Sequence, residues 1–108
     1  MDEMKYSVLV VDDHPLMRKG IVQLLELEDN IDVVGEASNG TDAVAMAKES
    51  EPDLILLDLN MKGLSGLDTL KALRAEEVTS RVVILTVSDA RQDVVALLKA
   101  GADGYLLK

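Results

Sequence analysis

Two short aliphatic runs, residues 8–11 and residues 54–57, each end in aspartate. Asp12 and Asp13 follow the first run, and Asp58 follows the second. A continuous aliphatic run of this length is typical of a strand that is buried on both faces, as in a parallel sheet covered by helices. If both runs belong to one such sheet, their carboxyl ends lie at the same edge, where open α/β sheets bind ligands. We therefore expect the three carboxylates to lie close together.

The rest of the chain alternates between patterns typical of strands and of helices. The first strand is predicted over residues 7–11. Further strands are predicted over residues 31–37, 54–57, 82–86 and 104–107, and helices over residues 14–27, 41–49 and 90–100, with one more around Leu67, Leu70 and Leu73. Pro15 favours the first position of the first helix, and Gly101 favours the end of the last. Strands and helices that alternate with short connections indicate a doubly wound α/β fold, with a five-stranded parallel sheet and helices on both faces.

A doubly wound sheet needs a helix after its fifth strand, but the sequence ends at Lys108. We therefore expect residues 1–108 to be one domain that is truncated before its last helix and before any further domain of a longer protein. Helices cover each face of such a sheet. We accordingly expect apolar side chains of the fifth strand, and of the first strand, to lie partly exposed.

The composition excludes several classes of function. Twenty acidic and eleven basic residues give a formal charge of −9, so this segment by itself should repel DNA and anionic membranes. The absence of cysteine excludes disulfides and thiolate chemistry. No apolar run approaches the roughly 18 residues that a membrane span requires. We expect a cytoplasmic protein.

The acidic edge has the residue types of a magnesium site. Mg²⁺ prefers oxygen ligands, and crowded carboxylates repel one another unless a hard cation lies among them. Asp13 and the backbone carbonyl of Asn60 would hold Mg²⁺ beside Asp58, and Asp12 would bind it directly or through water. His14 is interpreted as an exposed residue at the start of the first helix, with a role as ligand or phosphoryl relay as the alternative.

Two further residues at strand ends suit phosphoryl transfer. Asp58 would be the nucleophile that accepts the phosphoryl group. Thr86 ends the fourth strand and would donate a hydrogen bond to one phosphoryl oxygen. Lys108 ends the fifth strand and would neutralise another oxygen.

With these residues in place, the chain resembles the receiver domains of two-component response regulators. The matching positions are Asp12, Asp13, Asp58, Thr86, Tyr105 and Lys108. The segments at residues 11–18, 35–40 and 100–108 resemble the subfamily that joins its receiver to a helix-turn-helix DNA-binding domain. Residues 56–63 and 85–90 are most similar to its nitrate- and nitrite-responsive members.

The resemblance implies a flavodoxin-like sheet with the strand order 2-1-3-4-5. It also implies a mechanism and a set of partners. Phosphorylation of Asp58 by a sensor histidine kinase would move Thr86 toward the phosphoryl group, and Tyr105 would then turn inward as a switch. The implied partners are that kinase and the C-terminal helix-turn-helix domain of the full-length protein, with DNA contacted only through that domain. A second copy of the chain is a further candidate partner.

Two other classes of function share parts of this pattern. A Mg²⁺-dependent phosphatase of the haloacid dehalogenase type also uses an aspartyl nucleophile after a strand, but it usually needs a second aspartate where this chain has Asn60. A flavodoxin-like FMN carrier has the same topology. It would need a phosphate-binding loop after the first strand and aromatic residues around the flavin, whereas this chain has neither tryptophan nor phenylalanine.

Overall fold

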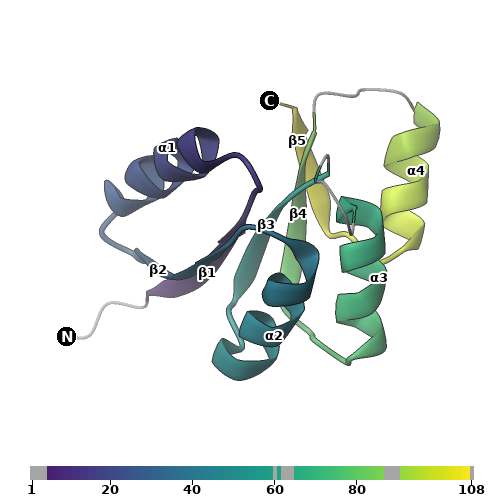
Figure 1. Ribbon diagram of the computed structural model, residues 1–108, viewed down its shortest axis with the longest axis horizontal. Coiled ribbons are helices and arrows are strands. Elements are labelled where there is room, and N and C mark those ends of the chain that lie inside the picture. The colour runs from purple at the N-terminus through teal and green to yellow at the C-terminus, as the bar shows by residue number, and fades with distance from the viewer. Residues whose placement is uncertain (1–4, 60, 62–64, 87–90, 108) are drawn as a thin grey trace.

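The computed structural model describes residues 5–59, 61, 65–86 and 91–107, which form an alternating α/β domain. The elements are β1 (Tyr6–Val11), α1 (Pro15–Glu26), β2 (Ile31–Ala37), α2 (Gly40–Ser50), β3 (Leu54–Asp58), α3 (Gly66–Ala75), β4 (Arg81–Thr86), α4 (Arg91–Lys99) and β5 (Gly104–Leu107). The strands form one parallel sheet in the order β2-β1-β3-β4-β5 (Figure 1). The predicted fold class and strand order are confirmed, and the predicted boundaries differ from the observed ones by at most one residue.

Side-chain caps explain where two of the helices begin. The side chain of Asn39 accepts a hydrogen bond of 2.8 Å from the backbone N–H of Asp42, so α2 begins at Gly40, one residue earlier than predicted. The hydroxyl of Ser65 accepts the backbone N–H of Asp68 in the same way and caps α3. The longest helix, α1, has 12 residues, and no helix in the described part of the chain is long and apolar enough to cross a membrane.

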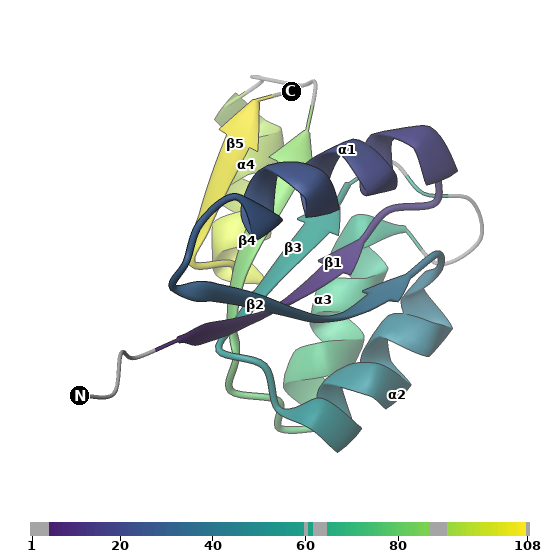
Figure 2. The same ribbon diagram turned by 90° about the vertical axis from the view of Figure 1, so that its left-hand side faces the viewer.

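The helices cover the two faces of the sheet unequally. Residues of α2, α3 and α4 pack on one face, where they form the larger part of the core with Leu9, Ile55 and Ile84. The opposite face has a smaller cluster around Val8 and Val10, against which α1 packs. Figure 2 shows α1 in front of the sheet, with α2 and α3 behind it. The carboxyl ends of all five strands point to one edge, because the sheet is parallel.

The prediction that apolar side chains of the fifth and first strands lie partly exposed is right for one strand and wrong for the other. In β5, Tyr105 is 41% exposed and Leu106 is 56% exposed, as expected. The prediction for the first strand is wrong, since Val8 and Val10 are fully buried. The physical reason is the strand order, which places β1 between β2 and β3 inside the sheet and leaves β5 at its edge beside β4.

Candidate functional site

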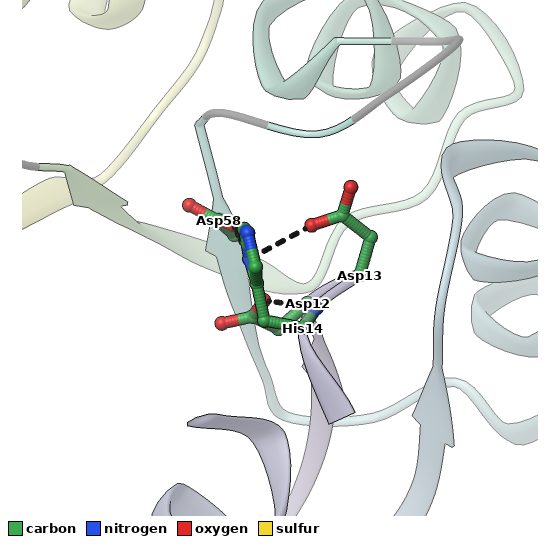
Figure 3. Close-up of side chains that lie close together, drawn as sticks. All are labelled: Asp12, Asp13, His14 and Asp58. Atoms are coloured by element: carbon green, nitrogen blue, oxygen red, sulfur yellow. Dashed lines mark hydrogen bonds and ion pairs between the residues drawn. The ribbon is translucent and has the colours of Figure 1, made fainter. Parts of the chain in front are cut away.

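The three predicted carboxylates meet at the carboxyl edge of the sheet. Val11 pairs with Leu57 in register, so Asp12 and Asp58 leave neighbouring strands at the same level. Both of these aspartates are completely buried, and Asp13 is largely buried. One carboxylate oxygen from each aspartate and one ring nitrogen of His14 lie within 4.8 Å of one another (Figure 3). The structure confirms that the three acids are neighbours.

Hydrogen bonds hold the backbone of Asp12 in place. Its N–H donates to the carbonyl of Ala37 at the end of β2, with a distance of 3.0 Å. Its own carbonyl oxygen accepts a bond of 2.7 Å from Nη1 of Arg18 in α1. Its Oδ1 accepts the backbone N–H of His14 at 2.8 Å. The acidic cluster is therefore preorganised by β2 and by the first turn of α1.

His14 lies closer to the acids than the sequence indicated. Its side chain is 63% exposed, in agreement with the prediction. Its Nδ1 nevertheless lies 3.1 Å from Oδ1 of Asp12, 3.0 Å from Oδ1 of Asp13 and 3.7 Å from Oδ2 of Asp58. The available signal was the order Asp-Asp-His-Pro, which places a histidine one residue after the acids, at the cap of a helix that Pro15 begins.

Thr86 and Tyr105 lie on the two strands beyond β3. Asp58 pairs with Leu85, so Thr86 follows on the neighbouring strand and is buried at the same edge. Tyr105 pairs with Ile84. Partners in a parallel ladder project to the same face and side chains alternate along a strand, so Tyr105 shares a face with Thr86. The remaining predicted site residues, Asn60 and Lys108, lie outside the described residues.

A close backbone contact joins α3 to the strand that carries Asp58. The N–H of Gly66 donates to the carbonyl of Leu59 at 3.0 Å. A Cβ atom at position 66 would lie 2.5 Å from Cα of Leu59 and 2.7 Å from the carbonyl oxygen of Asp58. Only glycine allows the start of α3 to approach the site this closely. Nothing in the sequence indicated that Gly66 packs against this strand.

The chemistry of the donor atoms fits a hard divalent cation. Three carboxylates crowded into a largely buried space repel one another, and a cation among them offsets both that repulsion and the cost of burying charge. Oxygen donors are the ligands that Mg²⁺ prefers. Asp12, Asp13 and Asp58 therefore fit the predicted ion. An aspartate at the end of a strand in such a cluster is also placed to act as a nucleophile toward phosphorus.

Comparisons with known proteins agree with this geometry. Residues 8–108 match the family described as "Response regulator receiver domain". The chain is 64% identical over 104 residues to a nitrate/nitrite response regulator homolog of Haemophilus influenzae, covering 96% of this chain and 50% of that protein. It is 61% identical over 103 residues to the nitrate/nitrite response regulator NarP of Escherichia coli, covering 95% and 48% of the two chains.

Solved structures show the same relationship. The signal receiver domain of the response regulator NarL from Mycobacterium tuberculosis superimposes with a TM-score of 0.92 at 40% identity, covering 97% of this chain and 85% of that one. Of the three functional classes raised by the sequence, these findings support the receiver over the phosphatase and the FMN carrier. The chain spans about half the length of the curated relatives it matches.

Proposed function

Because this chain belongs to the response regulator receiver domain family, we propose that it accepts a phosphoryl group on Asp58 from a sensor histidine kinase. The transferred group would then act as a switch within a two-component system. The observation that carries the proposal is the position of Asp58, buried at the end of β3 with Asp12 and Asp13 beside it. Such a site can bind a cation and present a nucleophilic oxygen at once.

The acidic residues have distinct roles in this proposal. An oxygen of Asp58 forms the bond to phosphorus as the bond from phosphorus to the kinase's phosphorylated histidine breaks. Asp13, Asp58 and the backbone carbonyl of Asn60 would hold Mg²⁺, with Asp12 bound directly or through water. Bound Mg²⁺ supplies positive charge that neutralises the phosphoryl oxygens. The fixed backbone of Asp12 keeps these ligands in place before the phosphoryl donor arrives.

Three residues would respond to the phosphoryl group on Asp58, namely Thr86, Lys108 and Tyr105. We assign to the Thr86 hydroxyl a hydrogen bond to one phosphoryl oxygen, and to the Lys108 ammonium an ion pair with another. The burial of Thr86 at the edge next to Asp58 supports its part. Tyr105 is 41% exposed on the face of the sheet that it shares with Thr86, so an inward turn would change the outer surface around β5.

The relatives indicate how such a switch would be used. They are nitrate/nitrite response regulators about twice as long as this chain. We infer that residues 1–108 are the receiver part of a cytoplasmic transcription regulator. Its C-terminal helix-turn-helix domain would bind DNA in response to nitrate or nitrite. The partners of the receiver would be the kinase, that domain and, in a homodimer, a second copy of the protein.

Phosphorylation can be tested by mass spectrometry of the intact protein. After incubation with acetyl phosphate and Mg²⁺, the wild type should gain the mass of one phosphoryl group, and Asp58→Asn should gain none. Asp32→Asn is the matched control, because Asp32 is exposed on β2, and it should react like the wild type. Labelling of Asp58→Asn at the wild-type level would contradict the proposal. Rapid turnover of small phosphate esters by the wild type would favour the phosphatase instead.

A further inference from the structure

We propose that His14 is a metal ligand, and that its imidazole makes this site prefer Co²⁺, Ni²⁺ and Zn²⁺ over Mg²⁺. The inference deepens the proposed function, because it rests on the same cation site formed by Asp12, Asp13 and Asp58. The sequence did not require it, since a histidine at the start of a helix is ordinarily solvent-exposed. What carries the inference is the place of the ring nitrogen among three carboxylate oxygens (Figure 3).

The distances fit donors that share one ion. Two atoms that each lie about 2.1 Å from a metal are about 3.0 Å apart in octahedral geometry and about 3.4 Å apart in tetrahedral geometry. Nδ1 of His14 lies 3.1 Å from Oδ1 of Asp12, 3.0 Å from Oδ1 of Asp13 and 3.7 Å from Oδ2 of Asp58. The nitrogen thus has the spacing of a fourth ligand, and all four donor atoms lie within 4.8 Å of one another.

The backbone holds His14 in this position. Oδ1 of Asp12 accepts its N–H at 2.8 Å, which folds the chain back over the acids. Pro15, whose ring restricts φ, begins α1 immediately afterwards. The His14 carbonyl accepts the N–H of Arg18 at 2.9 Å, the first hydrogen bond of the helix. The imidazole can therefore reach the acids without any rearrangement of α1.

The identity of the ligand decides which ions gain affinity. Carboxylate oxygens suit Mg²⁺ and Mn²⁺, whereas imidazole nitrogen adds affinity for Co²⁺, Ni²⁺, Cu²⁺ and Zn²⁺. The competing explanation is that Nδ1 simply donates a hydrogen bond to Asp12 across the same 3.1 Å. In that case His14 would orient a carboxylate and would not discriminate between metals. Metal binding by a variant without the ring nitrogen separates the two explanations.

The composition makes the test unusually direct. The chain contains one histidine and no cysteine. Any imidazole nitrogen signal that responds to a metal therefore belongs to His14. Nuclear magnetic resonance of the ring nitrogens reports whether Nδ1 is bound, and the visible absorption of Co²⁺ reports the ligand set. Neither measurement depends on phosphorylation of Asp58.

The experiment compares Mg²⁺ and Co²⁺ binding by calorimetry in the wild type and three variants. His14→Phe keeps an aromatic ring but has no donor atom. Gln23→Phe places the same ring at an exposed position of α1 and is the matched control. Asp13→Ala removes a ligand that both ions need. Circular dichroism checks that each variant is folded.

We expect His14→Phe to weaken Co²⁺ binding by on the order of 10- to 100-fold, as the loss of a metal-site partner does. Mg²⁺ binding should stay close to the wild-type value, and Gln23→Phe should match the wild type for both ions. Equal Co²⁺ affinity of the wild type and His14→Phe would overturn the inference. If both proteins still bound Mg²⁺ in that case, the proposed function would stand. Co²⁺ binding through His14 without any Mg²⁺ binding would support the inference and contradict the magnesium assignment. A wild type that binds neither ion would overturn both.

Discussion

Arg74 in α3 and Gly101 after α4 are joined by two hydrogen bonds from one guanidinium group to one carbonyl oxygen. The donor–acceptor distances are 3.2 Å from Nε and 2.8 Å from Nη2. The same guanidinium donates to the carbonyls of Val78 and Ser80 at 2.7 and 2.9 Å. It also forms an ion pair of 3.1 Å with Asp103. Arg74 therefore connects the end of α3 to the segments that lead into β4 and β5, at the edge of the sheet opposite the acidic edge.

Replacement of Arg74 should destabilise the domain without disturbing the acidic site. We expect Arg74→Ala to lower the free energy of unfolding by about 2–4 kcal/mol, because three partly buried carbonyl groups lose a charged donor. The stability of Arg74→Lys should lie between those of Arg74→Ala and the wild type, since an ammonium cannot reproduce the forked donors of a guanidinium. Urea denaturation measures both. Lys71→Ala changes an exposed residue of the same helix and should lower the free energy of unfolding by no more than about 0.5 kcal/mol. If Lys71→Ala were as destabilising as Arg74→Ala, the stabilising role of Arg74 would be refuted.

Two glycines should respond to alanine in opposite directions. Gly66→Ala should destabilise the domain by about 1–3 kcal/mol, because the added Cβ meets the backbone of Asp58 and Leu59. Gly20→Ala should stabilise it by about 0.5–1 kcal/mol, because Gly20 lies inside α1 and the new Cβ would meet no atom within 4 Å beyond its chain neighbours and the backbone of its own helix. Thermal melts of the two variants provide the comparison. The prediction fails if both variants shift in the same direction.

Glycine should be favourable at two positions after helices. Glu51 and Glu77 have φ values of 45° and 62°, in the left-handed region that costs L-residues about 1–2 kcal/mol. Glu51→Gly and Glu77→Gly should each raise the free energy of unfolding by about 0.5–1 kcal/mol, after the greater freedom of glycine in the unfolded chain is deducted. Glu49→Gly within α2 is the control and should destabilise by about 1 kcal/mol. Denaturation midpoints that fall in all three variants would speak against the prediction.

Mg²⁺ should stabilise the folded domain through the acidic cluster. At a concentration ten times its dissociation constant, the ion should add about 1.4 kcal/mol to the free energy of unfolding. Asp13→Ala removes a proposed direct ligand and should abolish that gain, while Asp32→Asn should keep it. Thermal melts with and without Mg²⁺ measure the difference. A wild-type response to Mg²⁺ in Asp13→Ala would exclude Asp13 as a ligand.

The ion pair between Lys48 and Glu76 should make a small, pH-dependent contribution to stability. Nζ of Lys48 donates to Oε1 of Glu76 at 2.7 Å, and this hydrogen bond, together with the lysine charge, lowers the pKa of Glu76 from its ordinary value. A carboxyl with a lowered pKa stabilises the fold above its unfolded pKa, and this stabilisation is lost as the pH falls through the folded pKa. Glu76→Gln should therefore be slightly less stable than the wild type at neutral pH and equal to it in strong acid. Urea denaturation from pH 7 to pH 3 checks this, and a difference that persists in acid would argue against the ion pair.

Local patterns were enough to predict the order of elements and the meeting of the acids. Continuous aliphatic runs indicated buried parallel strands, and alternation with helices implied a parallel sheet with helices on both faces. Because the carboxyl ends of parallel strands share an edge, Asp12 and Asp58 were expected at the same edge. The pairing of β1 with β3 makes them neighbours there. The residue types at the strand ends suggested the roles of Asn60, Thr86 and Lys108, and the resemblance to receivers added that of Tyr105. All four roles remain proposals.

Other features depend on contacts between residues far apart in the chain. Arg74 reaches Gly101 across 27 positions, and the Cβ that Gly66 lacks would meet the backbone of Asp58. The inward direction of the His14 ring depends on how Asp12 folds the first turn of α1 against the site. Spacing and propensity describe only neighbours along the chain, so the sequence by itself determined the elements and the acidic edge. Packing of the completed sheet decided which side chains face that edge, because only the tertiary structure brings separate elements within contact distance.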